Sequence, residues 1–117
     1  MEQLNKIELR GNVGSVRILR AGDSKGAKIT LATNYVYKNR DGDPVIETTW
    51  HNITVWEGKN IPDIEAIQRG DKLYVSGRLR IQKFVGNDGL ERTAYDVLAR
   101  SVQFVPGNDS LQYESTY

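Results

Sequence analysis

The sequence predicts an all-β fold, a five-stranded Greek-key barrel with one short helix between the third and fourth strands. Three observations lead to this prediction. Five segments alternate apolar and polar residues with the two-residue period of a strand, turns rich in Gly, Asn and Asp separate them, and the period becomes helical only near residues 61–67. A chain of 117 residues can enclose one such core but not two.

Each strand segment has its own signature. Gly11 and Gly14 interrupt the alternation of the first segment, which predicts a strand that bends, since glycine within a strand often marks a bulge. The second segment is rich in β-branched and aromatic residues, and the turn signals NRDGDP and GNDG follow the second and fourth segments. The strands are expected at residues 4–20, 28–37, 45–56, 72–84 and 92–104.

A helix is expected where the period changes. Ile61, Ile64 and Ile67 recur at helical spacing. Pro62 suits a first helical turn, and Gly70 ends the segment. Five strands with a helix between the third and fourth is the element order of an OB barrel, the oligonucleotide/oligosaccharide-binding fold.

The predicted OB domain covers residues 1–105. Residues 106–117 have little apolar content and no period, so a short, mobile C-terminal tail is expected. Charged residues interrupt the apolar positions of the N-terminus, which argues against a signal peptide or membrane span. The absence of cysteine excludes disulfides, thiolate metal sites and thiol nucleophiles. A cytoplasmic, nucleoid-associated protein is expected.

Two tryptophans, Trp50 and Trp56, stand six positions apart in the run TTWHNITVW. Alternation places both on one side of the third strand, while Ile53 and Val55 point to the other side and form its core face. The large rings are therefore predicted to face outward as a platform for base stacking. In the fourth strand, one side carries Leu73, Val75, Leu79 and Ile81, and the other side is aromatic and cationic, with Tyr74, Arg78, Arg80, Gln82 and Phe84.

The chain resembles the bacterial-type single-stranded DNA-binding proteins from about Leu4 to Val105. Each shared motif is short, but their order and spacing together are specific. The resemblance implies sequence-independent binding of single-stranded DNA in replication, recombination or repair. The motifs are NKIELRGNVG at 5–14, ITLAT at 29–33, TTWHNITVW at 48–56 and GDKLYVSGRLRIQKF at 70–84.

In that family, bases of the bound strand stack on a small set of aromatic side chains. Well-known members carry tryptophan where Tyr37 and Phe84 stand, and phenylalanine where Trp56 stands, so the type of ring varies but the aromatic face persists. Stacking contributes ~1–3 kcal/mol per base and tolerates any base. The resemblance implies stacking positions at Tyr37, Trp50, Trp56 and Phe84.

Cations around these rings are expected to contact phosphates. Arg10, Arg17 and Arg78 are weaker candidates. Asn52 and Gln82 stand where other members often have arginine, so this phosphate path is expected to be less basic than theirs. The predicted phosphate-binding residues are Lys6, Lys38, Lys59, Arg80 and Lys83.

His51, the only histidine, lies in phase with Ile53 and Val55, which favours a structural role at the core edge or at a subunit contact. The resemblance implies a subunit contact, because related members assemble as tetramers with this segment near an interface. A homo-oligomer is therefore expected, a tetramer or a dimer. Tyr35 shares the phase of the apolar residues of its strand and is expected to pack in the core or under a loop.

The sequence offers no set of residues for catalysis. Asp41, Asp43 and Glu47 do not complete the ligand spacing of a calcium loop, and Asp63 and Glu65 suit a helix start better than paired-carboxylate chemistry. No glycine loop followed by lysine is present to hold phosphates. We expect no enzymatic activity, metal or cofactor, and neither a membrane nor a small-molecule partner.

Family members usually continue into a flexible linker and an acidic tip that recruits repair and replication enzymes. This chain ends in ESTY at Tyr117, so recruitment by that route is not expected. A short paralogue, for instance from a mobile element, and a protein with different tail chemistry both fit. Two alternative functions remain: a primosome-type accessory protein, which lacks a tail and forms dimers, and a protein-interaction module that uses the aromatic face.

Overall fold

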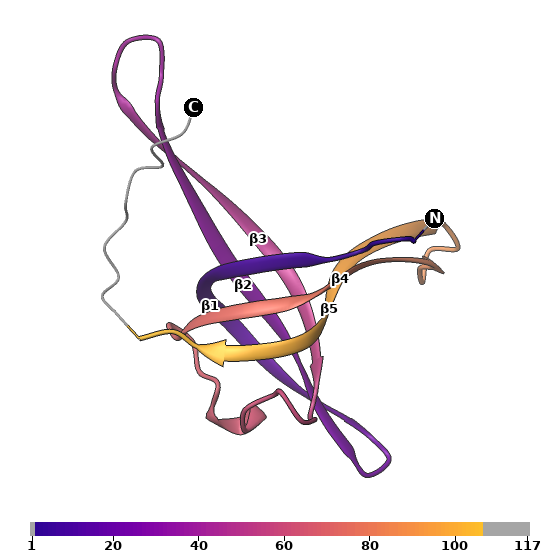
Figure 1. Ribbon diagram of the computed structural model, residues 1–117. Helices are drawn as coiled ribbons and strands as arrows, with labels where there is room; N and C mark the ends of the chain where they lie inside the picture. The colour runs from indigo at the N-terminus through magenta and orange to yellow at the C-terminus, as the bar shows by residue number, and fades with distance from the viewer. Residues whose placement is uncertain (1, 107–117) are drawn as a thin grey trace.

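The structure, a computed structural model, describes residues 2–106 (Figure 1). The predicted C-terminal tail lies outside the described residues, apart from Pro106. The elements in chain order are β1 (Ile7–Ala21), β2 (Ser24–Lys38), β3 (Pro44–Trp56), η1 (Ile64–Ala66), β4 (Lys72–Val85) and β5 (Glu91–Phe104).

The five strands close into a barrel in the order β1-β2-β3-β5-β4. Neighbouring strands are antiparallel except β3 and β5, which run parallel and pair only at Ile53↔Val97 and Thr54↔Leu98. This short parallel seam completes the barrel. The predicted all-β class and the five-stranded barrel are confirmed.

β1 bends so that it can pair with two neighbours in turn. Its first half pairs with β4 and its second half with β2. The register shifts between Val13 and Ser15, so Gly14 occupies the bulge that the glycines predicted. At Gly11 an added Cβ would lie 2.1 Å from the Ala32 carbonyl oxygen, so only glycine allows this close approach of β1 to β2.

The predicted helix is present as a single 3-10 turn, η1. The Asp63 carboxylate accepts a hydrogen bond from the Glu65 N–H at 3.1 Å, and the Ile67 N–H donates to the Ile64 carbonyl at 3.2 Å. Backbone at Ile67 is already extended, so no second turn forms. Ile64 and Ile67 are both buried, and their helical spacing reflects this one turn against the core. Within residues 2–106 no helix has the length and apolar content needed to cross a bilayer.

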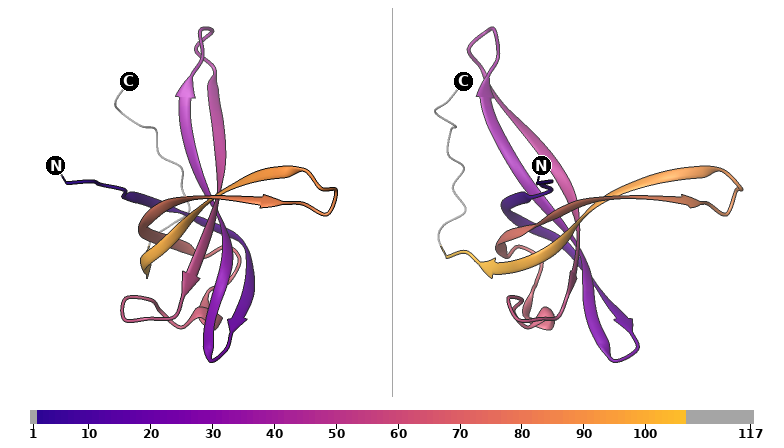
Figure 2. Two further views of the ribbon diagram at one scale, coloured as in Figure 1. Left: turned by 90° about the vertical axis from the view of Figure 1, so that its right-hand side faces the viewer. Right: turned by 45° about the vertical axis from the view of Figure 1, so that its right-hand side comes forward.

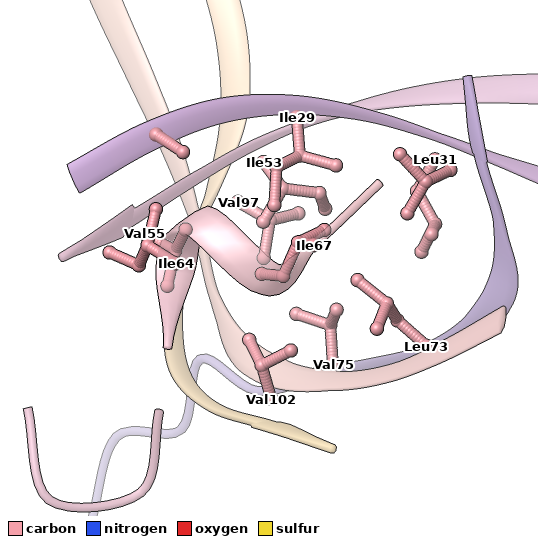
Figure 3. Packing of buried hydrophobic residues seen from close by; sticks show 12 residues of the cluster. Ile29, Leu31, Ile53, Val55, Ile64, Ile67, Leu73, Val75, Val97 and Val102 are labelled. Carbon is pink, nitrogen blue, oxygen red and sulfur yellow. The ribbon is translucent and has the colours of Figure 1, made fainter. Parts of the chain in front are cut away.

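The core lies inside the barrel and consists of aliphatic side chains from all five strands and the η1 segment (Figure 3). Apolar surface removed from water in this way contributes roughly 25 cal/mol per Å² to folding. β2, β3 and β4 each supply alternate residues, as expected for strands that bury one face. The cluster comprises Val13, Ala27, Ile29, Leu31, Ile53, Val55, Ile64, Ile67, Leu73, Val75, Val97 and Val102.

Long hairpins project from the barrel in different directions (Figures 1 and 2). We call residues 33–48 the β2–β3 arm and residues 79–95 the β4–β5 arm. Leu79 and Ile81 share the phase of buried Leu73 in β4, yet they are 42% and 56% exposed. Alternation therefore identifies the face of a strand but not where the strand leaves the barrel.

Candidate nucleic-acid interface

The outward face of β3 carries both tryptophans. Trp50 is 59% exposed and Trp56 is half-buried, whereas Ile53 and Val55 on the opposite face are fully buried. At ~3.3 Å rise per residue the two indoles stand ~20 Å apart along the strand. The predicted outward orientation of the two rings is confirmed.

Each indole lies against a glycine. A Cβ added at Gly14 in β1 would lie 2.3 Å from Cζ3 of Trp50, and one added at Gly26 in β2 would lie 2.6 Å from Cε3 of Trp56. Gly26 and Trp56 are also direct partners across β2 and β3. Because glycine has no side chain, the rings can approach the backbone closely. The sheet thus supports one side of each ring and limits its rotation.

A buried carboxylate joins four strands at the base of the β4–β5 arm. Asp96 is 7% exposed and faces Arg80 across the β4–β5 pair. Arg80 Nε and Nη2 donate to Asp96 Oδ1 and Oδ2 at 3.1 and 2.8 Å. Thr54 Oγ1 donates to Oδ2 at 2.7 Å, and Lys28 Nζ lies 3.8 Å from the same oxygen. These contacts link β2, β3, β4 and β5.

The charges in this cluster stabilise each other. Hydrogen bonds from Arg80 lower the pKa of the Asp96 carboxyl most, with help from Thr54 and the charge of Lys28, while burial opposes them. The Asp96 carboxylate in turn raises the pKa of Arg80. A predicted phosphate contact, Arg80, is therefore engaged in a bidentate ion pair within the protein.

The four predicted lysines are placed differently. Lys6 pairs with Glu8 at 3.0 Å, but both side chains are about half exposed, and such surface pairs contribute little. Among residues 2–106 no acidic side chain pairs with Lys38, Lys59 or Lys83. These three lie on the β2–β3 arm, in the loop after β3 and on the β4–β5 arm. Their ammonium groups are open to solvent.

The other two predicted stacking positions lie on the arms. Phe84 is 47% exposed on the β4–β5 arm, and half-buried Tyr37 is on the β2–β3 arm beside Lys38. Tyr35 is 37% exposed, and its ring centroid lies 5.9 Å from that of Tyr37, so of the two predicted places the barrel core is excluded, and the ring packs against Tyr37 on the β2–β3 arm. The rings therefore extend from β3 onto both arms rather than gathering at one point.

Two clefts flank the region where β3 and β5 separate, with volumes of about 360 and 410 Å³. Trp50 and His51 line the larger cleft, and Arg17, Lys28 and Gln82 line the smaller. The two clefts share Asn52, Ala94, Tyr95 and Asp96.

His51 is half-buried, and its Nε2 lies 2.9 Å from the Thr33 hydroxyl oxygen. Burial lowers the pKa of the imidazole. The residues that the structure describes include no group of three His, Asp or Glu side chains that could hold a metal ion. The groups available to bind a ligand at this surface are therefore aromatic rings, amides and cations.

Sequence reasoning missed Tyr95, Lys28 and Asp96. The run AYDVL contains a ring and a carboxylate in an otherwise apolar strand, which is an available signal that a second strand supplies a partner. That the partner is Arg80 depends on the register of β4 and β5, which includes a shift between Ser76 and Gly77.

Comparison with known proteins gives a family match over most of the chain. Residues 4–105 match the model of the single-strand binding protein family. A single-stranded DNA-binding protein of Neisseria meningitidis serogroup A is 33% identical over 123 residues, which cover 97% of this chain and 69% of the relative. One from Xanthomonas axonopodis pv. citri is 35% identical, covering 89% of this chain and 59% of the relative.

Solved structures agree with the fold. The Plasmodium falciparum SSB complex with ssDNA superposes with a TM-score of 0.69 at 29% identity and covers 91% of this chain and 98% of that chain. A deletion mutant of the single-stranded DNA binding protein from Thermus aquaticus gives a TM-score of 0.71 at 18% identity, covering 89% of this chain and 51% of that one, and supports the fold alone.

Proposed function

This chain belongs to the single-strand binding protein family, and from that premise we propose that it binds single-stranded DNA along β3 and both arms without reading base sequence. Stacking and charge neutralisation favour the unpaired strand over duplex, so binding needs no energy source and no catalytic step. Protection of single strands during replication, recombination or repair follows from such binding. The site of action is the DNA of the cytoplasm or nucleoid.

One observation carries this proposal: two indoles lie against glycine backbone on the outside of the barrel, with Trp50 59% exposed. An aromatic ring held in this way offers a face to any base. A protein-interaction module would use the same rings, and a primosome-type accessory protein the same fold. The family match and the four aromatic positions favour DNA as the ligand.

Titration with oligo(dT) tests the proposal. Tryptophan fluorescence is expected to fall strongly when the single strand is added and much less with duplex, because only unpaired bases can stack on the indoles. A change of equal size with both ligands would contradict the proposal. Native mass measurement in the same buffer gives the subunit count and separates a tetramer from the dimer of an accessory protein.

Substitution Gly14→Ala is expected to weaken DNA binding severalfold. The new Cβ would overlap Trp50 Cζ3, so the indole must shift from its supported position. Measured affinity for oligo(dT) should fall, and the emission of Trp50 should change in the free protein. Gly58→Ala is the matched control, because its added Cβ meets nothing closer than 3.9 Å. Equal affinities for the two variants would show that the glycine support is irrelevant.

The cations divide into two roles. Lys38, Lys59 and Lys83 are proposed to contact phosphates, with Lys6 available once DNA displaces Glu8. For Arg80 we propose a positioning role in place of the phosphate contact, because its guanidinium already binds Asp96. Each neutralised phosphate of a single strand lowers the slope of log affinity against log salt by ~0.7.

The double variant Lys59→Gln/Lys83→Gln is expected to make that salt slope shallower by about 1.4, since two phosphate contacts are lost. Affinity for oligo(dT) measured at several salt concentrations gives the slope. Arg69→Gln/Arg100→Gln removes the same charge at positions away from the arms and should leave the slope nearly unchanged. Equal slopes for both double variants would refute the assignment of the two lysines.

We propose that His51 lies at a subunit contact. It lines the larger cleft together with Trp50 and Asp96. Its Nε2 also contacts the Thr33 hydroxyl. Burial within one chain lowers the pKa of the imidazole, so the neutral form stabilises the fold, and this contribution is lost as pH falls below the ordinary value of about 6.5. A subunit contact would bury the ring further, so assembly would depend on pH in the same direction. The subunit count from native mass is expected to fall between pH 8 and about pH 5. His51→Gln should remove that dependence, and a count unchanged by pH in the wild type would exclude the role.

A further inference from the structure

A polar strip separates the two indoles on the outer face of the sheet. Residues 52 and 54 lie between Trp50 and Trp56 on that face of β3, and their cross-strand partners point to the same side. The strip comprises Asn52, Thr54, Thr30, Lys28, Ser15 and Arg17. A DNA strand that stacks one base on each indole must carry its sugar-phosphate backbone across this strip.

The strip contains two cations that stand directly opposite each other. Lys28 in β2 pairs with Arg17 in β1. Both side chains line the smaller cleft, where Arg17 is exposed and the Lys28 side chain is 40% exposed. Like charges at directly opposite positions destabilise a sheet unless an anion compensates them. The pair therefore suits an anionic ligand that enters the cleft.

A second cationic pair on the same hairpin is compensated within the protein. Arg20 stands opposite Lys25, and alternation places both on the other face of the hairpin from Arg17 and Lys28. The Glu65 carboxylate lies 3.8 Å from Nη2 of Arg20 and 3.4 Å from Nζ of Lys25. One carboxylate of the protein thus serves both cations of this pair.

The carboxylate nearest to Lys28 already has a partner. Arg80 Nη2 donates to Asp96 Oδ2 at 2.8 Å, and Thr54 Oγ1 donates to the same oxygen at 2.7 Å. Lys28 Nζ lies 3.8 Å from this oxygen, which is beyond hydrogen-bond length, so the attraction is electrostatic only. Among residues 2–106 no acidic side chain pairs with Arg17. Because Arg80 balances the charge of Asp96, the two cations of the strip keep a net positive charge.

Two hydroxyls beside the cations supply a further donor. Ser15 stands opposite Thr30, and their hydroxyl oxygens are 2.9 Å apart. One hydroxyl proton is used in this contact, and the other is available to donate to a ligand. Phosphate oxygens accept hydrogen bonds from hydroxyls as well as from Arg and Lys. The smaller cleft therefore offers the groups that bind a phosphate.

We propose that Arg17 and Lys28 together bind one phosphate of the DNA strand where its backbone passes from Trp50 to Trp56. The inference rests on the proposed binding of single-stranded DNA and adds a phosphate contact to that site. The phosphate takes the place of the missing acidic partner between the two cations. Lys28 turns toward it from Asp96, to which it makes no hydrogen bond.

The double variant Arg17→Gln/Lys28→Gln tests the site. Its slope of log affinity for oligo(dT) against log salt is expected to be shallower by about 0.7, since one phosphate contact is lost. Arg20→Gln/Lys25→Gln is the matched control, because it removes the same residue types from directly opposite positions where Glu65 already compensates them. This control should keep the wild-type slope. Thermal unfolding shows that both variants fold.

The outcomes separate this site from the general function. Slopes that change equally in the two double variants refute the site. If Trp50→Ala weakens binding while Arg17→Gln/Lys28→Gln keeps the wild-type slope, the site is refuted and the proposed function stands. If the wild type does not bind oligo(dT), the proposed function fails and the site fails with it.

Lysine acetylation gives a test that needs no variant. The N-hydroxysuccinimide ester of acetic acid is expected to modify Lys28 more slowly after oligo(dT) is added, because the phosphate covers its ammonium group. Lys25, whose ammonium group lies beside Glu65, should react at the same rate with and without DNA. Mass spectrometry of the digested protein gives both rates. A rate at Lys28 that DNA leaves unchanged overturns the proposal.

Discussion

Replacing Trp50 and Trp56 together with alanine is expected to reduce the free energy of DNA binding by about 2–6 kcal/mol, which corresponds to one stacked base for each ring. Both indoles face outward and are supported from beneath by Gly14 and Gly26, so their loss removes stacking surface without opening the barrel core. The loss of binding free energy is obtained from the affinity for labelled oligo(dT), measured by fluorescence anisotropy because this variant has no tryptophan to report binding.

The matched control is Trp50→Phe/Trp56→Phe, which keeps an aromatic face at both positions. Its affinity should lie much closer to that of the wild type than to that of the alanine pair. Thermal unfolding must show that all variants fold. A loss of less than about 0.5 kcal/mol in the folded alanine variant would favour a protein partner for this surface over DNA.

Substitution Asp96→Ala is expected to have the largest effect on folding, a decrease of about 3 kcal/mol in the free energy of unfolding. The change leaves Arg80 without its bidentate partner and Thr54, which is 3% exposed, without its acceptor. Arg80 retains some contact with water, so the cost lies at the lower end of the range for a broken buried pair. Urea unfolding monitored by tryptophan fluorescence measures it.

A contrasting ion pair on the same hairpin serves as the control. Asp88 pairs with Arg92 near the tip of the β4–β5 arm, where both side chains are about half exposed. Asp88→Ala should therefore change stability little, since exposed pairs are screened by water and salt. Equal effects of the two substitutions would show that burial of Asp96 does not determine its contribution.

The Asp96 carboxyl also predicts how stability depends on pH. Its pKa is lowered in the folded protein, mainly by the hydrogen bonds from Arg80. The stabilisation is complete above the unfolded value of about 4 and is lost as pH falls through the lower folded value. Wild-type stability should thus fall more steeply below about pH 4 than that of Asp96→Asn.

Much of this architecture follows from local pattern. Alternation located all five strands and the outward direction of Trp50 and Trp56, because a side-chain period of two depends only on neighbouring residues. The bend of β1 followed from Gly14 for the same reason. A structural feature could be predicted from the sequence when the residues that cause it lie within the same strand.

Contacts between distant strands could not be predicted in this way. The pairing of Arg80 with Asp96 requires the β4–β5 register, and the exposure of Ile81 requires the point where the hairpin leaves the barrel. η1 stopped after one turn although its apolar spacing suited a longer helix.

The parallel pairing of β3 with β5 has a mechanical consequence. Pairing of β2 with β3 is continuous from Gly26↔Trp56 to Lys38↔Pro44, whereas the wall between β3 and β5 is joined at two positions only. A force that pulls the two arms apart is shared among all the hydrogen bonds that join a pair of strands. The β3–β5 pair has the fewest such bonds and therefore resists the force least. We therefore expect the barrel to open first between β3 and β5, with every hairpin still intact.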